Sequence, residues 1–398
     1  MRNPNAGQRL LSQRVRDIPS STIRGAMKLA ADATACGDVV NLAQGLSGFP
    51  TPQAFKDEAI AAIAANRNQY CDTFGHPLLR QAIAKKYQRS GLPVDWETEV
   101  TVTCGVSEGI NLALLTVVNP GDEVIMFEPF YENHRPNILI AGGVPKFVQL
   151  RKPDWTFDRS ELARAFNKRT KAIIINNPNN PTSRVFTLDE LQFIASLCQK
   201  WGTLAICDEI YEHMVWDGRR HVMFSTLPGM EERTFTCSGL SKTYNVTGWR
   251  VGWVIAPAVY TEALRRVHDY LTLSAPTPFQ YAGICALESP PQFYDDLVSE
   301  HTALRDRLAG HLQAAGFNFL LPQGSYFFFA DCSPFGFEDD RQLAQYFAEV
   351  LKVIAVPGSA FYQPGQNTNL VRFCFAKPLE MLDLAGERLL ALASRVKN

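Results

Sequence analysis

EVTVTCGVSEGINLALLTVVNPGDEVIMF, residues 99–127, combines two short runs rich in apolar and β-branched residues with one helical pattern between them. Residues 99–105 and 123–127 predict strands, and residues 107–118 predict the helix that connects them. A strand, a crossover helix and a second strand form the unit from which parallel sheets are built. This stretch therefore predicts an α/β fold.

The same alternation continues to about residue 256. Thr187 and Glu190 are spaced as a capping box, which predicts a helix that begins at residue 188. Strands that alternate with crossover helices predict a large domain, residues 46–289, whose mostly parallel sheet carries helices on both faces. Helices are expected over 131–142, 161–167 and 187–202, and strands over 144–150, 171–176, 204–208, 233–239 and 250–256.

After about residue 290 the pattern changes. A long charged helix is expected over 292–316, followed by an apolar strand over 325–331, a second helix and a strand over 370–376. This order predicts a smaller α+β domain. We expect it to comprise residues 290–398 together with residues 1–45, which form an N-terminal arm.

Composition excludes several classes of partner. The 39 Lys and Arg residues nearly balance the 40 Asp and Glu residues, and no block of like charge occurs. Such a chain offers neither a basic groove for nucleic acid nor a polybasic patch for a membrane. The expected partner is a small molecule.

Cysteine usage and the apolar runs indicate a cytoplasmic protein. The nine cysteines form no C-x-x-C pair, which argues against a disulfide framework and against a metal site. The first residues lack the apolar core of a signal peptide, and no run approaches the roughly 18 apolar residues of a membrane span. We therefore expect no metal and a reducing compartment.

Polar or glycine residues follow the predicted strands where each strand ends. In an open parallel sheet, ligands bind in the crevice outside the carboxyl ends of the strands. We therefore expect one site to collect the residues that follow these ends, namely Gly105, Tyr131, Asn180, Asp208 and Lys242.

Lys242 lies in SGLSKTYNVTGWRVGW, residues 238–253, between a predicted strand and a glycine-containing segment. Most lysines are simply exposed surface residues, whereas a nucleophilic lysine needs an enclosed site that lowers its pKa. The motifs around it decide between these interpretations: S-K-T-x(5)-W-R-x-G stands with N-N-P-x-N-P-T at 176–182 and D-E-I-Y at 208–211. Together they predict a catalytic lysine.

With these motifs, the chain resembles the fold-type I pyridoxal 5'-phosphate (PLP) enzymes, specifically the class I/II aminotransferases. It is most similar to the branch that holds kynurenine aminotransferase, glutamine transaminase K and methionine aminotransferases. The resemblance runs from about residue 40 to about residue 375. It implies that Lys242 holds PLP as a Schiff base and carries protons during catalysis, and that Asp208 faces the pyridine nitrogen.

The resemblance also assigns the groups around the coenzyme ring. Tyr211 and Asn180 match the pair that hydrogen-bonds the phenolic oxygen. Tyr131 matches the aromatic residue that stacks on the pyridine face, with its neighbour Phe130 as the competitor. By itself, Asn180 in a Pro/Asn-rich stretch would be interpreted as a turn former.

The phosphate group needs backbone donors and positive charge. Gly105, Val106 and Ser107 open a helix directly after a strand, and Arg250 adds a permanently charged fork. Many relatives carry a phosphate-binding serine three residues before the lysine, where this chain has Gly239. The choices for its replacement are Ser238 and Ser241, of which we select Ser241.

Tyr70 matches a tyrosine that reaches the phosphate of a neighbouring subunit, although a loop tyrosine also has a purely structural interpretation. The match implies a homodimer with its active site at the interface.

Arg372 matches the residue that binds the substrate α-carboxylate. An arginine on an apolar strand must find a partner, and an intramolecular salt bridge is the alternative. The backbone of Gly45 is expected to approach the same carboxylate, beside Asn180. The alternative is that the turn alone requires a glycine there. The segment around Ile23 and Arg24 is expected to contribute to the side-chain pocket.

The leading functional hypothesis is a ping-pong aminotransferase that moves an amino group from an L-amino acid to a 2-oxo acid. A second hypothesis is another PLP reaction in the same site, above all β-elimination from cysteine conjugates. A third, a PLP-binding sensor fused to a DNA-binding module, would need a basic segment that the roughly 40 residues before VVNLAQG do not provide.

Overall fold

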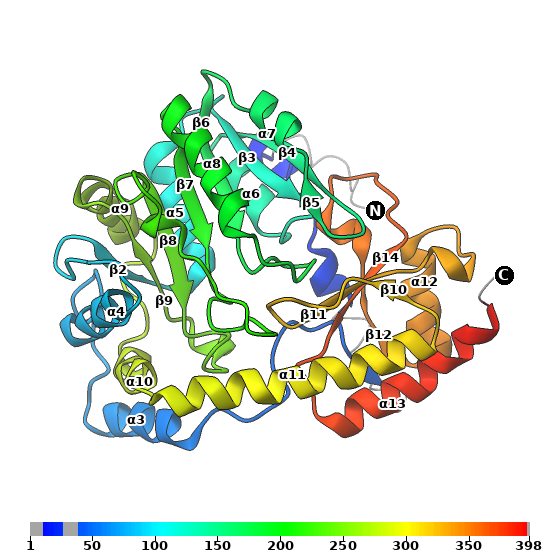
Figure 1. Cartoon of the computed structure of the whole chain (residues 1–398). Coiled ribbons are helices and arrows are strands. Elements are labelled where there is room, and N and C mark those ends of the chain that lie inside the picture. The colour runs from blue at the N-terminus through cyan, green and yellow to red at the C-terminus, as the bar shows by residue number, and fades with distance from the viewer. Residues whose placement is uncertain (1–10, 27–38, 396–398) are drawn as a thin grey trace, which may run out of the picture.

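Residues 11–26 and 39–395 are described by the computed structural model, and their strands form three sheets (Figure 1). The eight-stranded sheet has the order β2-β9-β8-β7-β6-β3-β4-β5. Its strands are β2 (Val100–Thr103), β3 (Glu123–Glu128), β4 (Val144–Arg151), β5 (Thr156–Phe157), β6 (Thr170–Asn176), β7 (Leu204–Asp208), β8 (Thr234–Gly239) and β9 (Gly252–Ile255).

The large sheet is mostly parallel, as the sequence predicts. Strands β4, β3, β6, β7 and β8 run in the same direction. Strand β9 is antiparallel to both of its neighbours, β8 and β2, and β5 is antiparallel to β4 at the far edge. An α-helical crossover is not needed between antiparallel neighbours, and residues 240–251, which join β8 to β9, contain only the short 3₁₀ helix η3 (Thr247–Trp249).

Helices cover both faces of this sheet. Along β6, Ala172 and Ile174 belong to one buried cluster, whereas Ile173 and Ile175 belong to another. Successive side chains of a strand point to opposite faces, so the two clusters lie on opposite sides of the sheet. The first cluster includes residues of α5 (Val106–Val117) and α6 (His134–Ile140), and the second includes residues of α7 (Arg159–Ala165) and α8 (Leu188–Trp201).

Helix α8 shows why these elements form where the sequence predicts. Thr187 accepts the N–H of Glu190, whose carboxylate accepts the N–H of Thr187, so the capping box is confirmed. Gly202 ends the helix in a left-handed conformation.

The C-terminal part of the chain forms a four-stranded antiparallel sheet of order β10-β11-β14-β13. Its strands are β10 (Asn318–Phe319), β11 (Phe327–Asp331), β13 (Val356–Pro357) and β14 (Leu370–Cys374). The pair β1 (Val40–Asn41) and β12 (Val353–Ile354) joins the N-terminal part of the chain to this region. In Figure 1 the long helix α11 (Pro291–Ala314) runs from α3 (Gln53–Ala64) and α10 (Thr277–Leu287) to α13 (Leu379–Leu389) and packs against α13.

The remaining helices complete the surface. No helix within residues 11–26 and 39–395 is both long enough and apolar enough to cross a membrane. The remaining helices of the described residues are α1 (Gln13–Arg16), α3 (Gln53–Ala64), α4 (Pro77–Arg89), α9 (Ala258–Leu271), α10 (Thr277–Leu287), α12 (Asp340–Tyr346), the short 3₁₀ helices η2 (Phe224–Thr226), η4 (Ser333–Phe335), η6 (Gly358–Phe361) and η7 (Leu390–Arg395), and the π-helical turn η5 (Phe347–Leu351).

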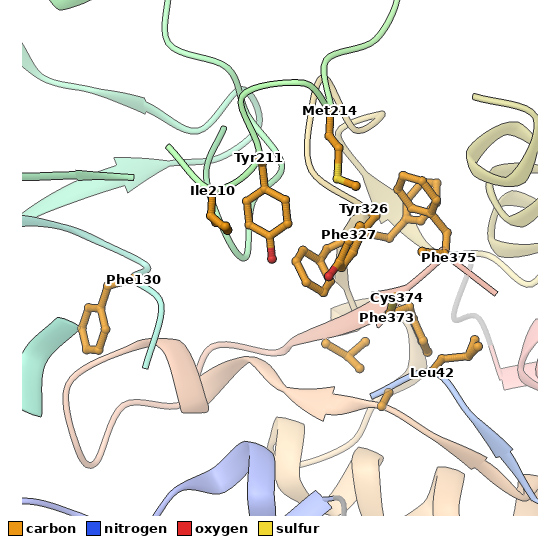
Figure 2. Close-up of a cluster of buried hydrophobic side chains, with 14 of the residues drawn as sticks. Leu42, Phe130, Ile210, Tyr211, Met214, Tyr326, Phe327, Phe373, Cys374 and Phe375 are labelled. Atoms are coloured by element: carbon orange, nitrogen blue, oxygen red, sulfur yellow. The ribbon is translucent and has the colours of Figure 1, made fainter. Parts of the chain in front are cut away.

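A buried aromatic cluster joins the two sheets (Figure 2). Tyr211 and Met214, which follow β7, lie beside Tyr326 and Phe327 at the start of β11. The rings of Tyr211 and Tyr326 meet edge to face with their centroids 5.3 Å apart. This contact brings the carboxyl ends of the large sheet against the four-stranded sheet that carries Arg372.

Candidate active site

A cavity of about 280 Å³ opens beside the carboxyl ends of the parallel strands. It collects side chains that lie far apart in sequence, as the strand order predicts. The predicted site residues that line it are Ile23, Gly45, Val106, Ser107, Tyr131, Asn180, Asp208, Tyr211, Ser241, Lys242, Arg250 and Arg372.

Lys242 follows β8 in the turn that begins at Gly239. Its Nζ donates a hydrogen bond to the carbonyl oxygen of Gly45 at 2.7 Å, and the Tyr326 hydroxyl donates to the same oxygen at 2.8 Å. Burial of the amine, together with the nearby Arg372 guanidinium, lowers the pKa of Lys242 to about 8. A larger share of this amine is therefore neutral near pH 7 than for an exposed lysine, and the neutral form is the nucleophile.

Asp208 is the last residue of β7 and is buried. Its Oδ2 lies 3.0 Å from Nε2 of His134, at the first position of α6. The backbone N–H of Ile210 approaches the other oxygen at 3.4 Å. His134 was not among the residues predicted from the sequence, although it stands only three residues after Tyr131.

Tyr211 lies over the same cavity. Burial raises the pKa of its phenol well above the ordinary value, so the group keeps its proton and can donate a hydrogen bond. The Nζ of Lys242 lies 6.0 Å from the centre of this ring. The amine and the hydroxyl therefore face one small volume.

Arg372, on β14, is buried with no carboxylate within salt-bridge distance among the described residues. Its Nη1 donates to Oδ1 of Asn180 at 2.9 Å and its Nη2 to the carbonyl oxygen of Ala43 at 2.9 Å, while its Nε has no hydrogen-bond partner in residues 11–26 and 39–395. The guanidinium also lies over the Phe327 ring, 4.1 Å from its centre. Within the part of the chain that the structure describes, the intramolecular salt bridge considered from the sequence is not formed, and the buried guanidinium lines the cavity without a paired carboxylate.

The cavity lining also combines the first residues of α5 with the Arg250 guanidinium. Gly105 caps α5 with φ +79°, so the N–H groups that open the helix point outward. The Arg250 side chain crosses over this glycine and donates to the carbonyl oxygens of Thr247 at 3.0 Å and Cys104 at 3.2 Å. A Cβ at Gly105 would lie 2.2 Å from Nη2 of Arg250, so only glycine leaves room for the arginine.

The region around Gly239 separates the two candidate serines. Ser238 donates to Oε1 of Glu212 at 2.6 Å and does not line the cavity, whereas Ser241 lines it. A Cβ at Gly239 would approach Cα of Gly252 to 2.9 Å, because β8 and β9 pass very close together there.

Three predicted residues do not line the cavity. Gly105 lies directly behind its wall, under Arg250. Arg24 is exposed, and Tyr70 is 76% exposed. Of the two aromatic candidates, Tyr131 lines the cavity, whereas Phe130 packs against Phe147 with ring centroids 5.6 Å apart.

Several lining residues escaped the sequence analysis. Some of them stand within the quoted motifs, as Asn176 and Ile210 do, but nothing in the sequence shows that their side chains face the cavity. The unpredicted lining residues are Gln44, Leu46, Ile110, Asn133, Asn176, Ile210, Thr247 and Phe327.

Comparison with known proteins identifies the family. Residues 37–389 match the family model described as aminotransferase class I and II. This chain belongs to the class I and II aminotransferases. It is therefore an enzyme that catalyses PLP-dependent transamination, and the resemblance seen in the sequence is confirmed.

Individual relatives agree with this family. The chain is 38% identical to kynurenine–oxoglutarate transaminase 3 of Mus musculus, over 94% of this chain and 89% of that protein. The solved structure of N-succinyldiaminopimelate aminotransferase from Mycobacterium tuberculosis superposes with a TM-score of 0.92 at 37% identity, over 96% of this chain and all of that one. A second structure, YbdL from Escherichia coli, with a reported methionine aminotransferase function, gives 0.91 at 32% identity, over 96% of this chain and 99% of that one.

These relatives bear the names of transaminases or aminotransferases and none that of a lyase, so they support the leading hypothesis over β-elimination. The family also establishes the fold as that of the fold-type I PLP enzymes, with an amino acid and a 2-oxo acid as substrates.

Proposed function

We propose that Lys242 binds the coenzyme of this aminotransferase and that one cavity serves both halves of a ping-pong reaction. The observation that carries the proposal is that Lys242, Asp208 and the uncompensated Arg372 line the same cavity. These residues provide a nucleophilic amine, a buried carboxylate and a carboxylate receptor.

The residues present fit PLP. The cradle at Gly105, which a Cβ would fill, and the fork of Arg250 suit a phosphate group, with Val106, Ser107 and Ser241 beside them. The buried Asp208 suits a protonated pyridine nitrogen, and Tyr131 offers an aromatic face. When bound, the coenzyme supplies an aldehyde that condenses with amines and a ring that withdraws electrons.

Lys242 would act twice. Its amine would first hold the coenzyme covalently, and once displaced by the substrate amine, it would move the proton at the substrate Cα. The lowered pKa of Lys242 suits both tasks, because the free amine can accept a proton near neutral pH. Tyr211 would donate a hydrogen bond from its protonated phenol to the phenolic oxygen of the coenzyme, together with Asn180.

Asp208 would keep the ring nitrogen protonated. His134, in the first turn of α6, contacts one oxygen of the Asp208 carboxylate and thereby fixes the orientation of this group. A carboxylate held in this way pairs with a cation without having to reorganise.

Arg372 would receive the substrate α-carboxylate. Among the described residues, its Nε has no hydrogen-bond partner and no carboxylate lies within salt-bridge distance, so a substrate carboxylate would supply the missing counter-charge. Retention of the carboxylate favours transamination over decarboxylation. Gly45 would lie next to this group, because a Cβ there would come within 3.9 Å of Nη2 of Arg372.

The substrate side chain would face Ile23, Leu46 and Phe327, which line the same cavity. Arg24 remains a candidate for a charged side chain, although it is exposed in this single chain. The relatives act on kynurenine, N-succinyldiaminopimelate and methionine by name, and these define the first amino donors to compare.

We propose a homodimer in which Tyr70 reaches the phosphate of the second copy. Large apolar side chains are exposed on two segments, with Tyr70 and Leu78 on one and Tyr270 and Leu271 on the other. Nε2 of His268, close to Tyr270 in α9, lies 3.0 Å from the carbonyl oxygen of Thr73, so the two segments adjoin. Exposed apolar side chains of this size favour burial against a second chain.

We further propose the division into a large domain, residues 46–289, and a small domain, residues 1–45 with 290–398. It is supported by the sheets, since the eight-stranded sheet lies between residues 100 and 255 and the four-stranded sheet between residues 318 and 374. We also propose a cytoplasmic location, which the nine scattered cysteines support.

The test is a panel of amino donors assayed against pyruvate, 2-oxoglutarate and phenylpyruvate. Conversion of the bound coenzyme to its amine form should follow donor addition without the acceptor, and a 2-oxo acid should then reverse it. Ammonia release that needs no 2-oxo acid would instead indicate a lyase.

A further inference from the structure

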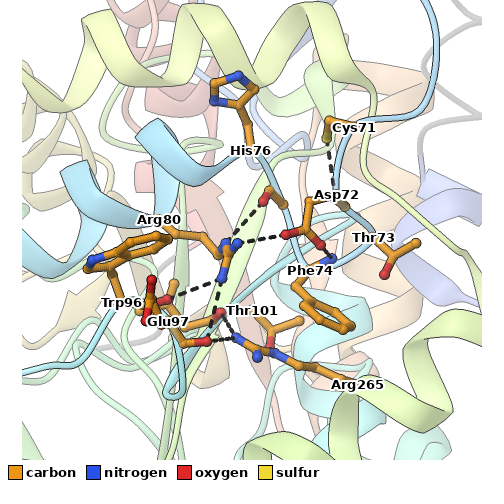
Figure 3. Close-up of polar contacts among 12 residues, drawn as sticks. Cys71, Asp72, Thr73, Phe74, His76, Arg80, Trp96, Glu97, Thr101 and Arg265 are labelled. Carbon is orange, nitrogen blue, oxygen red and sulfur yellow. Dashed lines mark hydrogen bonds and ion pairs between the residues drawn. The ribbon is translucent and has the colours of Figure 1, made fainter.

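Residues 70–76, which carry Tyr70, are anchored to two helices (Figure 3). Nη2 of Arg80, in α4, donates to Oδ2 of Asp72 at 2.7 Å, and its Nε donates to the carbonyl oxygen of Gly75 at 3.0 Å. Arg265, in α9, stacks on Phe74 with its guanidinium 4.3 Å from the ring centre. The backbone beside Tyr70 is therefore fixed relative to α9.

One turn further along α9, His268 joins this segment to α5. Its Nε2 lies 3.0 Å from the carbonyl oxygen of Thr73, and its Nδ1 lies 3.0 Å from Oε1 of Glu108. The His268 side chain is completely buried. A carbonyl oxygen only accepts, so Nε2 must carry a proton.

Glu108 connects His268 to the end of the cavity that suits a phosphate. It lies in the first turn of α5, and its Oε2 accepts the backbone N–H of Cys104, the residue before Gly105. Burial alone would raise the pKa of Glu108, but hydrogen bonds from His268, Thr272 and the Cys104 N–H together lower it. Nδ1 of His268 and Oε1 of Glu108 lie 3.0 Å apart, so one proton lies between them, and the pair as a whole carries no net charge.

Both backbone polar groups of Cys104 are hydrogen-bonded to side chains. Its N–H is bonded to Glu108, and its carbonyl oxygen accepts the 3.2 Å hydrogen bond from Nη2 of Arg250. A continuous path therefore leads from Thr73 through His268 and Glu108 to the Gly105 turn. The path ends where the coenzyme phosphate would lie.

We infer that His268 is a positioning residue for the phosphate of the coenzyme. His268 neutralises Glu108 and couples the Gly105 turn to the segment that carries Tyr70. The inference rests on the proposed function. Without His268, a buried carboxylate would face the same helix N-terminus as a phosphate dianion, and the two negative charges would oppose each other.

A purely structural role for His268 makes a different prediction from an electrostatic one. If packing alone mattered, removing the Glu108 charge as well would add to the damage. If the charge matters, Glu108→Gln should relieve the defect caused by His268→Gln, because the amide oxygen can still accept the Cys104 N–H while the charge is gone.

The experiment measures the affinity of the full-length chain, freed of coenzyme, for two probes: PLP and pyridoxal, which lacks the phosphate. The variants are His268→Gln, Glu108→Gln and the double variant. His311→Gln is the matched control, because His311 forms a similar pair with Asp383 at 2.9 Å between α11 and α13 and does not line the cavity.

We expect His268→Gln to weaken PLP binding by about 10-fold or more while pyridoxal binding stays within about twofold of wild type. The double variant should recover most of the lost PLP affinity, and His311→Gln should behave as wild type. If His268→Gln proves insoluble, His268→Asn gives the same test.

Wild-type PLP affinity in His268→Gln would overturn the inference. So would equal weakening of PLP and pyridoxal, or a double variant no better than the single one. Borohydride trapping of PLP on Lys242 of the wild type, performed on the same samples, tests the proposed function separately from the role of His268.

Discussion

At the scale of single residues, the least usual feature is an arginine buried without a carboxylate. Burial disfavours a charge, and it lowers the pKa of Arg372. Asn180, Ala43 and the Phe327 ring provide only partial compensation. Because the described residues place no carboxylate beside this cation, we propose that the α-carboxylate of the substrate compensates it.

Replacement of Arg372 by Ala should therefore raise the KM for the amino acid far more than it lowers kcat. A charge-assisted contact contributes about 2–3 kcal/mol, which corresponds to roughly 30- to 150-fold in KM. Steady-state kinetics with a good donor measures this. An amine without a carboxylate is the control, and its KM should change little. An unchanged KM for the amino acid would show that Arg372 does not bind the carboxylate.

The pKa of Lys242 supplies a prediction for pH. Only the neutral amine attacks an aldehyde, so in the coenzyme-free protein the rate of condensation with PLP should rise as the pH increases through about 8 and then level off. The ordinary lysine value is near 10.4. Stopped-flow absorbance at a series of pH values gives the midpoint.

The Arg372 guanidinium contributes to this lowering, so Arg372→Ala should move the midpoint upward. A midpoint near the ordinary lysine value in the wild type would mean that the amine is not in the enclosed environment described here.

At the scale of elements, the N-terminus of α5 is the part of the site most sensitive to shape. Gly105→Ala should weaken PLP binding at least about 10-fold, because its Cβ would displace Arg250 and the backbone has φ +79°. Gly121→Ala is the matched control, since Gly121 has φ +89° with open space around it. Both variants carry comparable backbone strain, and only the first should lose coenzyme in an absorbance titration.

The strand ends explain how far sequence reasoning reaches. Asp208 ends a strand and Lys242 and Tyr131 follow strands, and a mostly parallel sheet brings such positions to one edge, so all three could be placed from the sequence. The reversed direction of β9 could not be predicted from the sequence, because the apolar pattern of a strand is the same whichever way the strand runs. His134 and His268 were missed because their partners, Asp208 and Glu108, lie in other elements.

At the scale of the whole molecule, the exposure of Tyr70 distinguishes it from the other predicted residues. If it completes the site of a second copy, a dimer with Tyr70→Ala in one subunit and Lys242→Ala in the other has one intact site. Each variant alone should be nearly inactive, and mixed, reassembled subunits should regain activity. If mixing restores nothing although hybrid dimers form, Tyr70 does not act across an interface.

The packing of the two sheets against each other gives the catalytic arrangement its rigidity. The aromatic cluster of Figure 2 fixes Tyr211 to Tyr326, and Tyr326 in turn shares the Gly45 carbonyl oxygen with Lys242. The lysine is therefore positioned jointly by the large sheet and by the C-terminal sheet.

The most direct measurement is borohydride reduction of the enzyme with PLP, followed by peptide mass spectrometry. We predict one phosphopyridoxyl adduct per chain, located on Lys242, and no adduct there together with no transamination in Lys242→Ala. An adduct on a different lysine, or turnover of Lys242→Ala comparable to that of the wild type, would contradict the assignment of this side chain as the coenzyme-binding residue.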